Sequence, residues 1–294
     1  MLQNLFKMRE RSKCVLCGSQ ELRTLSKGTF NSIRHFIAAD PWGEDPLEHI
    51  SDEPWCFVCC DDCGMKFHRL ILSPEWSEIR FTKWMDQSSI EQFEKTHFRY
   101  NPARGHVQHI LRLQKLVGPQ PRLLDFGCGS GNFLKMAALF GLDSVGVDRS
   151  AARRKIAGFE IANDLDEIDG DFDIITMFEV LEHLDDPLDV LTQLTKRLRP
   201  TGIFVVEVPD CTGVSQISTE YAYRKIHPLE HINAFEPDTL IKILQRVGLR
   251  PIAKLPAYVT TDPIRLGKDI GKAVTKQNST QRYFKRATSS TPIR

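Results

Sequence analysis

Short apolar runs alternate with longer helical patterns along the middle of the chain. Four runs have the length and composition of β-strands: Arg122–Phe126, Ser144–Val147, Phe172–Met177 and Ile203–Val208. Four stretches between or beside them are predicted helices: Gly105–Val117, Asn132–Phe140, Pro187–Leu198 and Pro237–Val247. Strands and helices that alternate with short connections predict a mostly parallel sheet covered on both faces. We therefore expect an α/β protein with a doubly wound sheet.

The same pattern divides the chain into three regions. Residues 1–92 show little sustained periodicity and hold most of the cysteines. Residues 93–261 contain the alternating strands and helices, and we expect them to form the main domain. Residues 262–294 are polar and basic with a Thr- and Ser-rich end, which is typical of a mobile terminus.

Composition narrows the class of protein. The 39 Lys and Arg nearly balance the 38 Asp and Glu, so the net charge of +1 gives no argument for nucleic acid or an anionic membrane as partner. Apolar stretches are interrupted well before the ~18 residues of a membrane span. The start of the chain, Met1–Lys13, is too charged for a secretory signal. We expect a cytoplasmic protein without a membrane span.

A glycine-rich loop follows the first predicted strand of the main domain. Its glycines alternate with other residues: Gly127, Gly129 and Gly131. A dinucleotide fingerprint needs glycine where Asn132 stands, so the loop suits a smaller adenosyl ligand. Asp125 ends the strand and could orient the loop amides and face a ligand ammonium group. Asp148 ends the second strand, where a carboxylate can accept hydrogen bonds from ribose hydroxyls. Another nucleotide, or no ligand, is the alternative.

Four segments in order resemble the motifs of class I methyltransferases that use S-adenosylmethionine (SAM). Leu124–Gly131 resembles the first motif, Gly146–Ser150 the second, Asp171–Leu184 the block around the third strand, and Leu198–Gly202 the turn before the next strand. The resemblance covers roughly residues 95 to 255. It implies a Rossmann-like fold and methyl transfer from SAM.

The resemblance also implies which residues contact the cofactor. Asp164 would lie near the adenine amino group, and the residues that end the third strand would lie against the cofactor. The full set that we expect to bind SAM is Asp125, Gly127, Cys128, Gly129, Gly131, Asp148, Arg149, Asp164, Phe178 and Glu179.

Two CxxCG segments in the first region predict a metal site. We expect the ligands to be Cys14, Cys17, Cys60 and Cys63, because both pairs are followed by a glycine that opens the turn toward the sulfurs. Cys56 and Cys59 lack that glycine and are the spare thiols. Four thiolates favour structural zinc. An iron–sulfur cluster, or reduced thiols without metal, are the alternatives.

A module of this kind before a SAM domain resembles bacterial methyltransferases of nucleotide-linked sugars and related glycans. Glu230–Phe235 resembles their Glu-His-aromatic segment, in which the histidine is a proposed base. The chain departs from the carbon-methylating type, because Pro228 and Leu229 stand where a Tyr-His pair is typical. It is also too short for the further domain that those enzymes usually carry.

Methyl transfer from a sulfonium requires a positioned acceptor and in many cases a base. We expect His231 to be that base, with Glu230 and His183 as the other candidate catalytic residues. His183 could instead pack behind the cofactor, and the role of His227 stays open. Phe30, Phe36, Trp42 and Trp55 could line an acceptor groove, but aromatic residues beside a zinc knuckle more often form a small core.

The expected activity is methyl transfer to oxygen or carbon of a small molecule, nucleotide-sugar or glycan. An RNA or protein methyltransferase that uses the zinc module for binding is the alternative. Neutral charge and the absence of an Arg-aromatic stripe disfavour it, as does Val208–Asp210, which lacks the motif of enzymes that methylate base amino groups. A non-enzymatic SAM-binding or zinc scaffold protein would have no use for Asp125, the glycine loop and Asp148 together.

Overall fold

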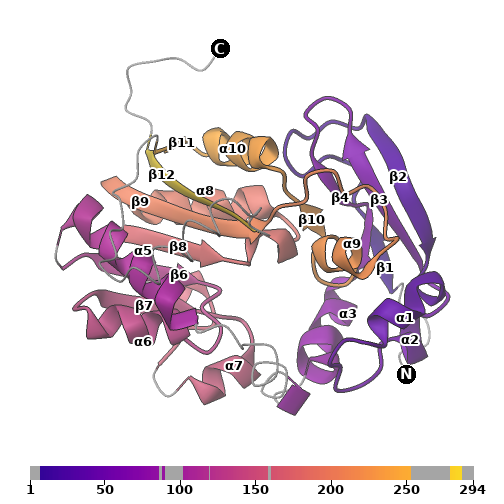
Figure 1. Ribbon diagram of the computed structural model, residues 1–294, viewed down its shortest axis with the longest axis horizontal. Helices are drawn as coiled ribbons and strands as arrows, with labels where there is room; N and C mark the ends of the chain where they lie inside the picture. Colours follow the sequence, from indigo (N-terminus) through magenta and orange to yellow (C-terminus); the bar gives the residue numbers. More distant parts are fainter. Residues whose placement is uncertain are drawn as a thin grey trace, which may run out of the picture. The chain divides into compact units, whose positions relative to one another are not determined.

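The chain folds into two compact units, each assembled from several segments of the sequence (Figure 1). The structure is a computed structural model that describes residues 7–85, 88–89, 102–118, 120–157, 160–252 and 279–286. The first unit comprises Met1–Tyr100, Glu182–Pro187 and Cys211–Thr239. The second unit comprises Asn101–Leu181, Leu188–Asp210 and Leu240–Arg294.

The second unit is built on a sheet whose described strands follow the order β11-β12-β9-β8-β6-β7. The strands are β6 (Arg122–Phe126), β7 (Asp143–Val147), β8 (Phe172–Phe178), β9 (Leu198–Pro209), β11 (Leu249–Pro251) and β12 (Ser279–Arg286). Strands β7, β6, β8 and β9 are parallel to one another, whereas β12 runs antiparallel to both β9 and β11. The predicted α/β fold with a mostly parallel sheet is confirmed.

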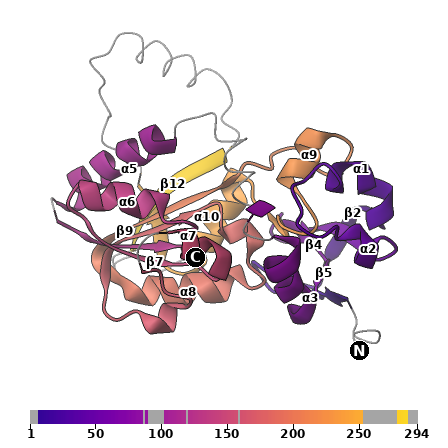
Figure 2. The ribbon, with the colours of Figure 1, turned by 90° about the horizontal axis from the view of Figure 1, so that it is seen from below.

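Helices cover this sheet. They are α5 (Pro102–Val117), α6 (Asn132–Leu139), α7 (Ala151–Ile156), α8 (Pro187–Arg197) and α10 (Pro237–Arg246), with a short 3-10 helix η3 (Leu165–Glu167). Figure 2 shows α5 and α6 on one side of the sheet and α8 on the other. Ile110 and Leu113 of α5 are fully buried and pack with residues of the sheet, as one face of an amphipathic helix does.

Strand β12 corrects the expectation of a mobile basic tail over residues 262–294. Residues 279–286 pair with β9 from Ser279↔Pro209 to Lys285↔Ile203. Tyr283 and Phe284 point to opposite faces of the sheet, and both are buried. Two adjacent aromatic residues are enough to anchor a strand when it can pair with a long edge such as β9. The rest of the expected tail lies outside the described residues.

The first unit has shorter helices and strands, and its strands pair in antiparallel fashion. Its strands are β1 (Met8–Glu10), β2 (Leu22–Thr29), β3 (Pro54–Cys60), β4 (Lys66–His68), β5 (Leu70–Leu72) and β10 (Asn233–Ala234). They form a sheet of order β10-β4-β3-β2 and a β1-β5 pair. Its helices are η1 (Phe30–Ile33), α1 (Arg34–Ile37), α2 (Leu47–Ile50), α3 (Pro74–Ile79), the π-helical η2 (Arg80–Trp84) and α9 (Glu220–Lys225), and η4 (Leu181–His183) begins at its edge.

Two loops of the main domain belong to this first unit, which changes the boundary expected at residue 92/93. Strand β10 pairs with β4 through Asn233↔Phe67 and Ala234↔Lys66. Arg11 is buried and donates hydrogen bonds to the carbonyls of His68 and Ile232, at 2.9 and 2.6 Å, respectively. The loop between β9 and α10 is therefore held by backbone pairing and a buried guanidinium rather than by its own sequence neighbours.

The aromatic residues of the first region form a core. Phe30 and Trp55 are buried, and Phe36 and Trp42 pack against the same cluster, which also contains Tyr223 from α9. Several residues between β9 and α10, Tyr223 among them, belong to this core, so the N-terminal region needs them to complete it. Within the part of the chain that the structure describes, no helix is long and apolar enough to cross a membrane.

Candidate functional site

The glycine loop adopts a backbone conformation that L side chains rarely take. Gly127, Gly129 and Gly131 have φ angles of 76°, 56° and 70°. A Cβ on Gly127 would lie 2.3 Å from Cγ2 of Val180, so the loop also approaches the end of β8 too closely for any side chain there. Gly131 is the N-cap of α6. The loop therefore leads directly into a helix N-terminus, and the amides of its three glycines donate to the Val147 carbonyl, the Asp148 carboxylate and the Cys128 carbonyl.

Asp148 ties this loop to the end of β7. One carboxylate oxygen accepts a hydrogen bond from the Gly129 amide, and the other accepts one from the Ser150 amide, both at 2.8 Å. The side chain is buried. Because ionised carboxylate oxygens each have two acceptor positions, Asp148 can hold the loop and still accept a hydroxyl.

Asp125 is a second buried carboxyl group, at the end of the neighbouring strand β6. Thr176 donates a hydrogen bond to it at 2.7 Å. Burial raises the pKa of Asp125 to about 7, and the negative charge of Asp148 acts in the same direction. A carboxyl group in this state is stabilised as an anion when a cation binds beside it, which suits the ammonium group of an amino-acid ligand.

The remaining expected cofactor residues differ in their burial and contacts. Cys128 is half-buried, and its sulfur fills the space that a Cβ on Gly146 would need. Arg149 and Asp164 are exposed, and Asp164 caps η3. Phe178 packs edge-on against Phe133 with ring centroids 5.0 Å apart.

Glu179 has a feature that the sequence did not reveal. It is the one non-glycine residue with a positive φ, 54°, among those that the structure describes. Its amide donates to the carbonyl of Glu207 at 2.9 Å, which holds the strained conformation in place. Backbone strain of this kind concentrates at functional sites. The glycine loop, Asp125, Asp148 and Glu179 together fit an adenosyl ligand with an amino-acid end.

The first unit contains a cluster of histidine and carboxylate side chains. Glu182, His183 and His231 bring their side-chain ligand atoms within 4.8 Å of one another. The rings of His183 and His231 meet edge to face, with centroids 5.0 Å apart. Glu182 is 1% exposed, and its carboxylate lies 3.8 Å from Nε2 of His183. Sequence reasoning selected the two histidines but not Glu182, although its place beside His183 was a visible signal.

Hydrogen bonds fix the proton on His183. Its Nδ1 lies 2.8 Å from the backbone carbonyl of Glu230. A carbonyl only accepts, so Nδ1 carries the proton and Nε2 carries the lone pair. Glu230, one of the candidate catalytic residues, thus contributes its backbone oxygen to the site.

His231 is a half-buried, neutral imidazole. Burial lowers the pKa of His231 to about 4, although the nearby charge of Glu230 opposes the change. The ring is hydrogen-bonded to the backbone of Arg224 and Lys225. Its Nδ1 is buried, with no hydrogen-bond partner in the described part of the chain. A buried lone pair of this kind is available to a substrate proton.

A small pocket borders this cluster within the first unit. Its lining is mixed. The polar lining residues are Ser77, Arg80, His183 and Asp185, and the apolar ones are Ile71, Leu72, Pro228, Leu229 and Ile232.

The cysteine cluster lies elsewhere in the first unit. Cys14, Cys17, Cys60 and Cys63 have their sulfurs within 4.8 Å of one another, and Cys56 and Cys59 are outside this group. The Cys14–Cys63 and Cys17–Cys60 sulfurs are each 3.5 Å apart. The glycines that follow, Gly18 and Gly64, have φ of 78° and 81° and close each turn onto the first cysteine carbonyl.

The arrangement of these thiols is consistent with a bound metal cation. Burial raises the pKa of Cys14 to about 11 and raises that of Cys63 as well, whereas the pKa of Cys60 is lowered by backbone hydrogen bonds that outweigh its burial. Four sulfurs within 4.8 Å of one another have the donor set of a tetrahedral thiolate site.

The main domain matches a known family. Residues 95–254 match the model of a methyltransferase domain, so the chain belongs to this family and is a class I SAM-dependent methyltransferase.

The similar proteins support this membership. The chain is 30% identical over 206 residues to the ubiquinone biosynthesis O-methyltransferase of Dinoroseobacter shibae, covering 60% of this chain and 81% of that protein. It is 29% identical over 210 residues to the enzyme of the same name from Nitrosococcus oceani, covering 64% and 86%. The crystal structure of the plantazolicin methyltransferase BpumL has the same fold, with a TM-score of 0.51 and 14% identity over 72% of this chain and 95% of that one.

Proposed function

We propose that this methyltransferase transfers a methyl group to a phenolic oxygen of a small molecule, with His231 as the general base. The observation that carries the proposal is the buried Nδ1 of His231, which faces no protein hydrogen-bond partner among the described residues. The names of the similar enzymes support O-methylation of a small molecule. They give no support to the glycan or nucleotide-sugar acceptor expected from the sequence.

The basicity of His231 favours a phenol over a sugar hydroxyl. Proton transfer is efficient when the base and the acidic group have similar pKa values. The pKa of His231 is lowered to about 4 by burial. The pKa of a phenol, about 10, is nearer to that of such a base than the pKa of an alcohol, which is nearly as weak an acid as water at about 15.7. An acidic aromatic hydroxyl is therefore the better acceptor.

The neighbouring residues have supporting roles. His183 presents the lone pair of Nε2 because the Glu230 carbonyl holds the proton on Nδ1. Glu182 stabilises an imidazolium on His183 when a proton arrives there, because its carboxylate is 3.8 Å away. SAM, when bound, supplies the electrophilic methyl group. Asp125, Asp148 and the glycine loop orient it through the contacts described above.

We also propose that Cys14, Cys17, Cys60 and Cys63 hold a structural zinc ion. The four sulfurs form two glycine-terminated turns that face each other, which is the arrangement of a closed structural site. No side chain of another type belongs to this cluster, so we assign it no role in proton transfer.

A substrate panel tests the acceptor. Purified protein is incubated with methyl-labelled SAM and three probes, which are 3,4-dihydroxybenzoate, a deoxy nucleotide-sugar and total tRNA. We expect label in the dihydroxybenzoate and none above background in the other two. Label in the nucleotide-sugar or in tRNA, without label in the phenol, would overturn the proposed acceptor.

The role of His231 is tested by replacing it. We expect His231→Ala to lower kcat for the phenol by roughly 10²- to 10⁴-fold, the usual contribution of a general base. SAM affinity should be nearly unchanged. His35→Ala is the matched control, because His35 is an exposed histidine of the same unit. A fully active His231→Ala enzyme would exclude His231 as the base.

A further inference from the structure

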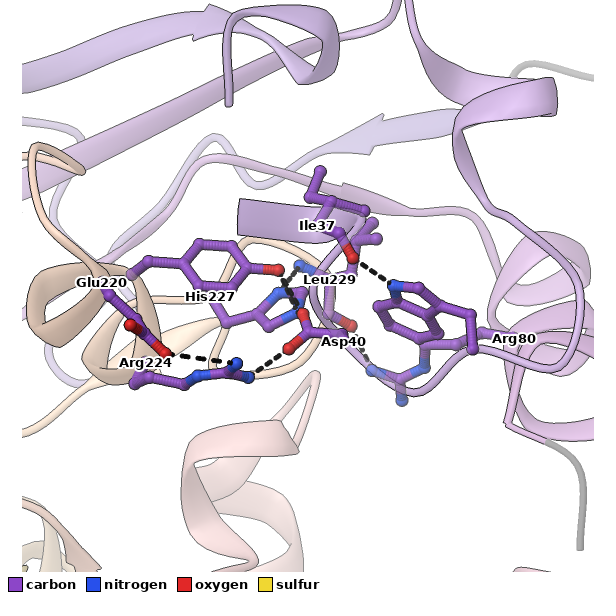
Figure 3. A network of polar contacts seen from close by, with 9 residues as sticks. Ile37, Asp40, Arg80, Glu220, Arg224, His227 and Leu229 are labelled. Carbon is purple, nitrogen blue, oxygen red and sulfur yellow. Dashed lines mark hydrogen bonds and ion pairs between the residues drawn. The ribbon is translucent and has the colours of Figure 1, made fainter. Parts of the chain in front are cut away.

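A buried network centred on Asp40 lies in the first unit (Figure 3). The Asp40 carboxylate accepts hydrogen bonds from Tyr223 at 2.5 Å and from Nε2 of His227 at 3.1 Å, and it pairs with Arg224. The side chains of Asp40 and His227 are 7% and 3% exposed. Burial alone would raise the pKa of Asp40, but the hydrogen bond from His227 and the contacts with Tyr223 and Arg224 lower it. Asp40 is therefore a buried anion.

The network has one consistent arrangement of protons. An ionised carboxylate only accepts, so Tyr223 must donate its hydroxyl hydrogen to Asp40. That hydroxyl has no second hydrogen to give, yet its oxygen lies 2.8 Å from Nε2 of His227. Nε2 must therefore be the donor in that contact and carry the proton. For a neutral imidazole this leaves the lone pair on Nδ1.

That lone pair shapes the following turn. Nδ1 of His227 lies 3.1 Å from the amide of Leu229, which can only donate. An acceptor side chain bonded to the amide two residues later reproduces the Asx turn that Asn and Asp form. The Glu230 amide also donates to the His227 carbonyl at 3.1 Å. The turn therefore depends on the tautomer of His227.

This turn holds the two candidate bases, His183 and His231. Its Glu230 carbonyl fixes the proton of His183, and His231 follows directly in the chain. The chain of contacts runs from the Asp40 charge to the His227 tautomer, the Leu229 amide, the Glu230 carbonyl and the His183 tautomer.

We propose that Asp40 is a positioning residue for methyl transfer, which sets the tautomer of His227 and through it the turn that holds His183 and His231. This role rests on the proposed function of the two histidines as the proton-accepting part of the site. Asp40 lies 187 residues from His227 in sequence, so the N-terminal module shapes the site through this contact.

Replacing Asp40 with Asn should reverse the tautomer. Arg224 is a charged donor, so it should hold the carbonyl oxygen of the new amide and turn the NH₂ group toward Tyr223 and His227. Nε2 of His227 then has to accept, and its proton moves to Nδ1, where it meets the Leu229 amide. We expect Asp40→Asn to lower kcat by roughly 10- to 100-fold, the loss typical of a misplaced catalytic group.

A double-mutant cycle isolates this route. An Asn at position 227 can accept from the Leu229 amide through its own side-chain oxygen and has no tautomer to set. We expect Asp40→Asn to change kcat by less than about threefold in the His227→Asn background. An equal loss in both backgrounds would overturn the proposal. Glu236→Gln is the matched control, because it removes a 2.6 Å ion pair with Lys66 that also ties this loop to the N-terminal region but avoids the turn. Its kcat should stay near that of the wild type.

Nitrogen NMR of the imidazoles separates this proposal from the proposed function. Unprotonated and protonated ring nitrogens have well-separated ¹⁵N shifts, and signals are assigned by substitution. In the wild type we expect an unprotonated Nδ1 on His227 and a protonated Nδ1 on His183, and both patterns should change in Asp40→Asn. These shifts are readable even if no phenol is methylated, in which case only the proposed function fails. An unchanged His183 pattern in Asp40→Asn would refute the positioning role.

Discussion

Asp125 and Asp148 end neighbouring parallel strands, and their surroundings give them different states. Asp148 accepts hydrogen bonds from two backbone amides, whereas Asp125 has one hydroxyl donor and is buried. Asp148 thus shapes the loop. Asp125, whose pKa is raised by burial, is poised to ionise when a cationic ligand arrives.

Asp148→Asn should weaken SAM binding by roughly 10-fold or more. An amide can accept with only one of its two ends, so either the Gly129 or the Ser150 amide would face another donor, at a cost of about 1–3 kcal/mol. Calorimetry with SAM measures the change. Asp143→Asn, on the exposed start of the same strand, is the control and should bind SAM as the wild type does. Equal affinities for all three proteins would remove Asp148 from the site.

At the scale of single residues, the sequence predicted those whose role depends on local backbone. The glycine loop, Asp125 and Asp148 follow directly from strand ends, and the two CxxCG turns carry their own geometry. Asp40 could not be predicted, because its function depends on a partner 187 residues away in sequence. Asp40 also lies next to no recognised motif, so the sequence around it did not indicate a role. The same is true of the strained conformation of Glu179.

At the scale of elements, β12 is the part of the second unit whose strength can be tested most directly. Phe284 is fully buried on one face of the sheet, and the strand pairs with β9 along seven residues. Phe284→Ala should lower the free energy of unfolding by about 3–5 kcal/mol. Urea unfolding followed by circular dichroism measures it. Lys285→Ala changes an exposed residue of the same strand and should have little effect. An unaffected Phe284→Ala protein would show that β12 adds nothing to the fold.

The two cysteine turns make a second prediction at this scale. Cys60→Ser should lose the zinc that we expect in the wild-type protein at one equivalent per chain, because three thiolates cannot close a tetrahedral site. Cys56→Ser should keep it, since Cys56 lies outside the cluster. Mass spectrometry of the metal content of each purified protein measures this. Zinc loss in Cys56→Ser with retention in Cys60→Ser would reverse the ligand assignment.

Helices and strands were predicted best where their hydrophobic pattern is strong. The four buried parallel strands and the helices α5, α6, α8 and α10 were predicted from the sequence because each is a continuous apolar or amphipathic run, whereas the short helix α7 was not. Strand β12 was missed because its six other residues are polar or basic and its order comes from pairing with β9. Strand β10 has only two residues, which is too few for any pattern.

At the scale of the whole molecule, the first unit is completed by loops that leave the second one. Its core joins Phe30 and Trp55 from the N-terminal region to Tyr223 and Leu229 from the loop after β9. Such long-range packing has no signature along the chain, so the sequence placed the boundary at one position where the structure has several. The two units also differ in how they bind protons, which gives them different responses to acid.

Acid should unfold the first unit before the second. Burial lowers the pKa of His68 to about 3 and that of His231 to about 4, from 6.5. Below pH 6.5 the unfolded chain binds these protons and the folded chain does not, so stability falls as the pH drops toward 4. In the second unit, the lowered pKa values of His109 and His106 act in this direction. The raised pKa of Asp125, about 7, acts in the opposite one, because the folded chain keeps that proton.

Tryptophan fluorescence measures this difference, since all four tryptophans, Trp42, Trp55, Trp76 and Trp84, belong to the first unit. Each buried neutral histidine changes the free energy of unfolding by about 1.4 kcal/mol per pH unit. Two such histidines should therefore give a slope of about 3 kcal/mol per pH unit between pH 6.5 and 4. His231→Gln should halve that slope in urea titrations of the fluorescence, and a zinc-sensitive dye in the same samples reports any metal release. Circular dichroism follows the second unit, which should lose less stability over the same interval. A fluorescence slope that is the same with and without His231 would show that its burial does not govern the acid response.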